Sequence, residues 1–77
     1  MSPSHQRPPR YKARVLTSRL RLYAESDHLD DTLSAAIAAL ARAYHISEPR
    51  ARAWTEGRDE TLTHRHGPAA LDWIEQR

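Results

Sequence analysis

The 77-residue chain contains no cysteine and no phenylalanine, and only two of its residues are glycine. Without cysteine, disulfide bonds and zinc sites built from thiolates are excluded. With two isolated glycines, the chain has no glycine-rich loop of the kind that holds phosphate groups. It also has no apolar run long enough to cross a bilayer and no signal-peptide core. We therefore expect a cytoplasmic protein that does not contact membranes.

Large apolar side chains are also scarce. Hydrophobic residues make up 39% of the chain, but 12 of them are alanine. The length allows one domain at most, with a small core and marginal stability. A homodimer that shares its core is therefore expected. A chain with so little room for a pocket is not expected to be an enzyme or to hold a cofactor.

Basic residues are concentrated near the start of the chain. The segment 1–24 holds six of them and no acid, whereas the remainder holds six arginines and ten acids. Pro8 and Pro9 disfavour helix there, so residues 1–12 are predicted to form a flexible basic arm. Residues 13–77 are predicted to form the folded domain. Arginine outnumbers lysine eleven to one, which indicates a GC-rich bacterial or phage genome.

Residues 29–44 give the clearest local prediction. Leu29, Leu33, Ile37, Leu40 and Tyr44 recur at spacings of three or four, which places one apolar stripe along a helix. Alanines, the best helix formers, fill most of the gaps. The pattern predicts a helix over 29–44.

A second helix is predicted to begin after Ser47. Serine is a favoured N-cap, and Pro49 is tolerated in a first turn. The helix is expected to run to about Glu56, and Gly57 is a natural stop.

The flanking segments are less well determined. Residues 13–25 fit either a strand or a helix, and 58–66 fit either a short helix or a loop. A last helix is predicted from Pro68, with Trp73 and Ile74 in the core, at a dimer seam or in an exposed patch for a partner protein. His64 and His66 are interpreted as exposed loop residues, and no metal site is expected.

The stretch 37–57 resembles a helix-turn-helix of the phage-repressor type. Ala41 stands where the two helices would cross, and Ile46 would fill the space under the turn. Ala51 and Trp54, three residues apart, would form the buried side of the second helix. His45 stands where the family usually has glycine, because that turn often needs a left-handed residue.

This resemblance implies a mostly α fold and a sequence-specific transcriptional regulator, such as a repressor, of bacterial, plasmid or phage origin. Its partner would be double-stranded DNA. Phosphate and minor-groove contacts are expected from the basic arm, and base contacts from the second helix. The expected DNA-binding residues are Arg7, Arg10, Lys12, Arg14, Ser47, Pro49, Arg50, Arg52, Ala53 and Glu56.

Two alternatives remain open from the sequence. A strand near residues 16–24 that presents Arg19, Arg21 and Tyr23 would resemble a dimeric ribbon-helix-helix repressor. The second alternative is a protein–protein adaptor or inhibitor, antitoxin-like or phage-encoded, which would grip a partner with its alanine-rich helix and its tryptophan-bearing end. The operator, the effector, and repressor or activator action are not specified by the sequence.

Overall fold

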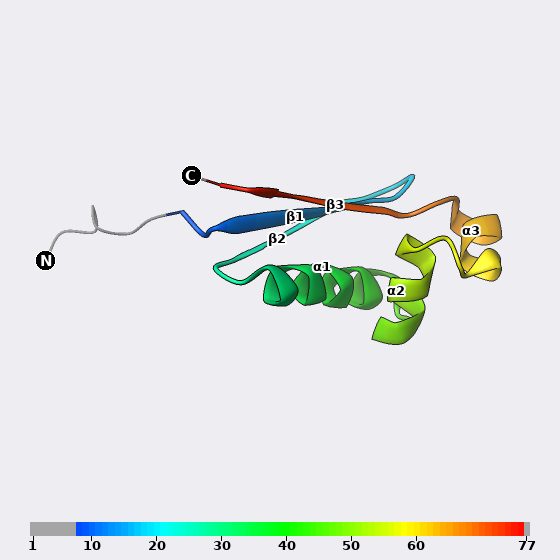
Figure 1. Cartoon of the computed structure of the whole chain (residues 1–77). Coiled ribbons are helices and arrows are strands. Elements are labelled where there is room, and N and C mark those ends of the chain that lie inside the picture. Colours follow the sequence, from blue (N-terminus) through cyan, green and yellow to red (C-terminus); the bar gives the residue numbers. More distant parts are fainter. Residues whose placement is uncertain (1–7, 77) are drawn as a thin grey trace, which may run out of the picture.

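The computed structural model describes residues 8–76, and within them three helices pack with a three-stranded antiparallel sheet (Figure 1). The sheet has the order β2-β1-β3. This is an α+β fold, so the prediction of a mostly α domain is wrong. The elements, in chain order, are β1 (Tyr11–Leu16), β2 (Arg21–Ser26), α1 (Leu29–Tyr44), α2 (Glu48–Thr55), α3 (Glu60–His66) and β3 (Ala70–Glu75).

The segment that fits either strand or helix forms a hairpin. β1 and β2 pair antiparallel around a turn at residues 17–20. The Thr17 hydroxyl accepts hydrogen bonds from the N–H groups of Arg19 (3.2 Å) and Leu20 (3.0 Å), so this turn needs no glycine. The single strand near 16–24 that the ribbon-helix-helix alternative requires is not formed, because the turn interrupts it.

The helix predicted after Pro68 is also wrong, because residues 70–75 form β3. This strand lies along β1, with Leu71 opposite Val15 and Trp73 opposite Ala13. The pairing supplies hydrogen bonds to the side of β1 that β2 leaves open. Sheet pairing with a distant segment therefore overrides the local preference for helix.

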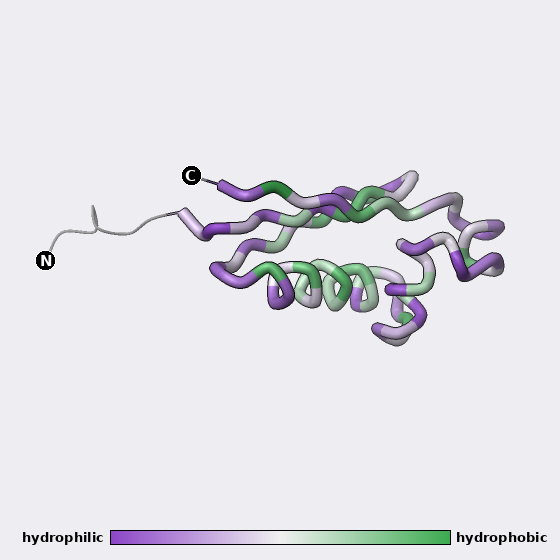
Figure 2. The backbone as a smooth tube through the Cα atoms, viewed as in Figure 1, coloured by the Kyte–Doolittle hydropathy of each residue, from purple (hydrophilic) through white to green (hydrophobic). Residues whose placement is uncertain are grey.

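Helix α1 has the predicted bounds, and it packs on β1 and β2. Its buried stripe meets the side of the sheet that carries Ala13 and Val15, and Figure 2 shows the apolar residues gathered between the two layers. Ile37 and Leu40 are fully buried there. The core is small, as the composition predicts.

The joint between α1 and α2 follows the predicted pattern. His45 is left-handed, with φ 55° and ψ 46°, and it is followed by Ser47, whose hydroxyl accepts a hydrogen bond from the N–H of Arg50 at 3.3 Å. Ala41 and Ala51 are buried, and Trp54 is 1% exposed. Helix α2 then ends at Thr55, and residues 60–66 form a further short helix.

Candidate functional site

Tyr44, the last residue of α1, brings together segments that are distant in the sequence. Its hydroxyl oxygen lies 2.7 Å from Thr17 Oγ1 in the turn of the hairpin. Its ring packs edge-on against Trp54 of α2 and His66 of α3, with centroids 4.9 and 5.0 Å away. The end of α1 is thereby joined to α2, α3 and the hairpin turn.

Two further hydrogen bonds complete this junction. The Ser18 hydroxyl donates to the carbonyl of His66 at 2.9 Å, and the indole N–H of Trp54 donates to the carbonyl of Gly67 at 2.9 Å. We refer to the part of the molecule that these contacts join, residues 17–21 and 41–67, as the helical end.

Asp59 fixes α3 relative to α2. Its carboxylate accepts a hydrogen bond from the N–H of Leu62 (2.9 Å), which caps α3, and another from Arg50 Nε (3.0 Å). The Leu62 N–H, and then Arg50, hold the pKa of Asp59 below its ordinary value. Asp59 therefore remains ionised at neutral pH, and Arg50 serves as a link between two helices.

The helical end is rich in arginine. It holds seven arginines against four acidic residues, Glu48, Glu56, Asp59 and Glu60. Arg50 and Arg58 form salt bridges with Asp59 and Glu56. The other five arginines are exposed and form no salt bridge within residues 8–76. These five are Arg19, Arg21, Arg42, Arg52 and Arg65.

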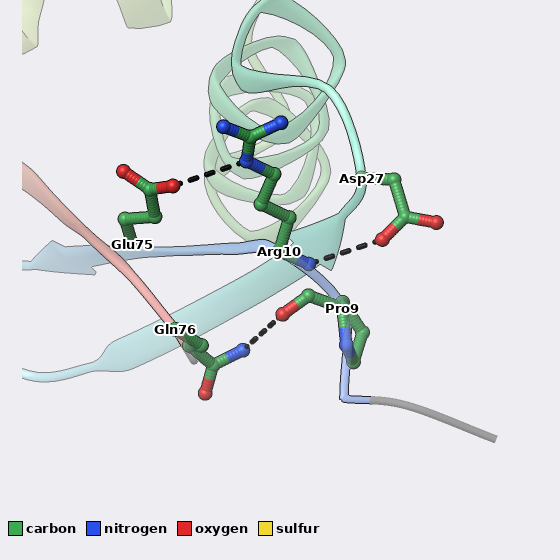
Figure 3. A network of polar contacts seen from close by, with 5 residues as sticks. All are labelled: Pro9, Arg10, Asp27, Glu75 and Gln76. Carbon is green, nitrogen blue, oxygen red and sulfur yellow. Dashed lines mark hydrogen bonds and ion pairs between the residues drawn. The ribbon is translucent and has the colours of Figure 1, made fainter. Parts of the chain in front are cut away.

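The opposite end of the molecule is acidic. The start of α1 carries Asp30 and Asp31. Figure 3 shows Arg10 between two acids: its backbone N–H donates to Asp27 Oδ1 (3.1 Å) and its Nε donates to Glu75 Oε2 (3.0 Å). The hydrogen bond with Glu75 is the main reason that the pKa of Arg10 is raised. Arg10 is thus already paired with carboxylates.

The basic residues predicted near the start of the chain do not lie beside α2. Arg7 lies outside the described residues. Lys12 and Arg14 lie in β1, on the face of the sheet turned away from α1. Arg14 donates two hydrogen bonds to Asp72, at 2.7 and 3.2 Å, and Lys12 Nζ lies 4.9 Å from the ring centroid of Tyr23.

The predicted residues of the second helix do lie together at the helical end. Pro49, Arg52 and Glu56 are exposed, whereas Ala53 is half-buried. Ser47 serves as the N-cap, and Arg50 bonds Asp59.

Sequence reasoning missed Arg42 and Arg65 as members of this group, and it considered Arg19 and Arg21 only under the ribbon alternative. No local pattern marks these four residues, because only the contacts around Tyr44 place them at the same end as α2.

Residues 8–76 contain neither a metal site nor a membrane-spanning helix, and the chain gives no match in three comparisons with known proteins. Among residues 8–76, no three His, Cys, Asp or Glu side chains are placed to hold a metal ion. No helix in that range is long and apolar enough to cross a membrane. No protein-family model matches the chain, and comparison with curated proteins and with solved structures found no match either.

Proposed function

We propose that the protein is a sequence-specific, DNA-binding transcriptional regulator of bacterial, plasmid or phage origin that acts in the cytoplasm. The helical end would be its DNA-contacting surface. The observation that supports this proposal most directly is the group of five exposed arginines that have no salt-bridge partner among residues 8–76. Such guanidinium groups are free to neutralise phosphates, which supplies most of the affinity of proteins for duplex DNA.

The α1–α2 joint supports a helix-turn-helix mode of binding. Ala51 and Trp54 bury one side of α2, which leaves Pro49, Arg52 and Glu56 on the exposed side. Arg52 is the residue best suited to read a base, because its side chain is unpaired in the described chain and arginine bonds guanine bidentately. The other four arginines would contact phosphates and set the position of α2.

Salt dependence of binding tests which surface meets the phosphates. Affinity for a nonspecific duplex is measured by fluorescence anisotropy over a range of salt concentrations, for the wild-type protein and for Arg42→Ala, Arg65→Ala and Arg10→Ala. Each variant removes one positive charge. Loss of one phosphate contact should flatten the slope of log affinity against log salt by about 0.9. We expect this for Arg42→Ala and Arg65→Ala but not for Arg10→Ala, whose guanidinium is paired with Glu75.

Base reading is tested with a duplex selected from a random library. Arg52→Ala should weaken binding to the selected duplex by about 1–3 kcal/mol and relax the preference at one base position. A protein adaptor, in contrast, would show no salt-dependent DNA binding and would select no sequence. Either of those two results would overturn the proposed function.

A further inference from the structure

The hydrogen bonds at the two ends of β1 fix which backbone groups of β3 point away from the sheet. Thr17 N–H donates to Leu20 O (3.0 Å) towards β2, and Gln76 N–H donates to Arg10 O (2.6 Å) between β1 and β3. Hydrogen-bonded pairs alternate along antiparallel ladders. The even-numbered residues of β3 therefore bond β1, whereas the N–H and C=O groups of Leu71, Trp73 and Glu75 point to the outer edge.

That edge has no strand beside it within residues 8–76. Its side chains are unusually apolar for an edge, since Trp73 is 46% exposed and Ile74 is 61% exposed. Both edge strands carry exposed charges, but Asp72 and Glu75 of β3 form salt bridges with Arg14 and Arg10, whereas Arg21 and Glu25 of β2 form none within residues 8–76 and so discourage pairing with another chain. The edge of β2 exposes one large ring, Tyr23 (51% exposed), which Lys12 covers in part, whereas the edge of β3 exposes two adjacent large apolar side chains, Trp73 and Ile74.

The position of α1 explains why Trp73 is exposed. Trp73 pairs with Ala13, whose side chain faces α1, so Trp73 lies on the same side of the sheet as the helix. However, α1 packs over β2 and β1, and Trp73 is covered on one side by the ring of Tyr11, 5.9 Å away. The uncovered part of Trp73 lies beyond the helix, next to the open edge.

We propose that the open edge of β3 binds a second copy of the chain, whose β3 runs antiparallel to it and completes a six-stranded sheet. Centring the pair on Asp72 places Leu71 opposite the partner subunit's Trp73 and keeps both α1 helices on one side of the sheet. The same register places Ala70 opposite the partner's Ile74. Each contact occurs twice, and each covers an exposed apolar side chain with another apolar residue.

The charges at the centre of this register are compatible with it. Two Asp72 side chains would face each other, but each carboxylate already accepts two hydrogen bonds from its own Arg14. Each Arg14 would therefore offset the charge of its own Asp72, which reduces the repulsion between the two carboxylates. Centring the pair on Trp73 would instead place Leu71 opposite the partner's Glu75 and Asp72 opposite the partner's Ile74, which mixes apolar residues with carboxylates. Only the register centred on Asp72 places the apolar residues of β3 opposite apolar residues of the partner.

The absence of cysteine allows a direct test. In the proposed register the two Asp72 positions form a non-hydrogen-bonded pair with Cα atoms about 4.5 Å apart, within the range of about 4.4–6.8 Å that a disulfide spans. Asp72→Cys should therefore give a disulfide-linked dimer on mild oxidation. Tyr23→Cys, at an exposed position of the other edge strand, is the matched control and should remain unlinked.

The mass in solution completes the experiment. Light scattering should show a dimer for the wild-type protein and for Tyr23→Lys, but a folded monomer for Ile74→Lys, which places a charge on the outer face of β3 without removing a buried side chain. A monomeric wild-type protein overturns the proposal. A dimer that Ile74→Lys leaves intact, or whose Asp72→Cys variant links no better than Tyr23→Cys, also overturns it.

Discussion

Tyr44 and Thr17, 27 residues apart in the sequence, share a hydrogen bond of 2.7 Å between their hydroxyl groups. This bond joins the end of α1 to the turn of the hairpin. Tyr44→Phe removes it and keeps the ring against Trp54 and His66. We expect a loss of about 0.5–1.5 kcal/mol in the free energy of unfolding, measured by urea denaturation. Thr17→Val should cost more, because the Thr17 hydroxyl also closes the turn. If Tyr44→Phe is as stable as wild type, the bond does not hold the helical end together.

Trp54 is the largest fully buried side chain among residues 8–76. Trp54→Ala should lower the free energy of unfolding by about 3–5 kcal/mol, the usual cost of removing a buried aromatic residue. Trp54→Phe is a milder change, because it keeps a ring in the core but loses part of the buried volume and the hydrogen bond to Gly67. It should be intermediate between Trp54→Ala and wild type. An unchanged melting temperature for Trp54→Ala would contradict the core described above.

His45 is the only non-glycine residue with positive φ in the described chain. Glycine adopts this conformation without strain, whereas a β-branched residue does so at a high cost. His45→Gly should therefore fold with stability equal to or above that of wild type, and His45→Val should be clearly less stable. Thermal denaturation distinguishes the two. Equal melting temperatures for both variants would show that the left-handed turn is not required.

The ionisation of Asp59 makes the stability of the fold depend on pH. Its pKa is lowered in the folded protein, chiefly by the N–H of Leu62 and then by Arg50. A carboxyl group with a lowered native pKa stabilises the fold fully above its unfolded pKa of about 3.9, and this contribution is lost as the pH falls through the native value. Denaturation midpoints at pH 7 and pH 3 should therefore differ less for Asp59→Asn than for wild type. Arg50→Gln should keep most of the wild-type difference, because Leu62 still donates.

Proline tests the ladder of β3. The N–H of Glu75 points to the outer edge, so Glu75→Pro should keep every backbone hydrogen bond to β1 and lose only the exposed ion pair with Arg10. The N–H of Ile74 bonds β1, so Ile74→Pro removes a ladder bond, which strands tolerate poorly. We expect Ile74→Pro to have the lower melting temperature of the two at low protein concentration. The reverse order would show that the alternation assigned to β3 is shifted by one residue.

The parts of the fold that depend on nearby residues could be predicted from the sequence. The stripe of residues at spacings of three and four set the bounds of α1, and Ser47 marked the start of α2. His45 was recognised as the left-handed position of the joint. Each of these features is decided within one or two helical turns, where capping and periodicity act.

The sheet could not be predicted in the same way. In residues 70–75, Leu71 and Trp73 alternate as a strand requires, but Ile74 is also apolar and breaks the alternation. The hairpin turn contains no Gly, Asn or Asp, because the Thr17 hydroxyl supplies its hydrogen bonds. The candidate site shares this limit, since Arg42 and Arg65 join Arg52 only after α1, α2 and α3 have packed around Tyr44.

The central position of β1 has a consequence for the order of folding. One neighbour of β1 follows it after a short turn, but the other is β3, and the contact between Arg10 and Glu75 spans 65 residues. Closing so long a loop is slow compared with forming a hairpin or a helix. During synthesis the hairpin and α1 emerge first, while one side of β1 remains unpaired until β3 leaves the ribosome. The pairing of β1 with β3 is therefore expected to form last, after the hairpin and α1.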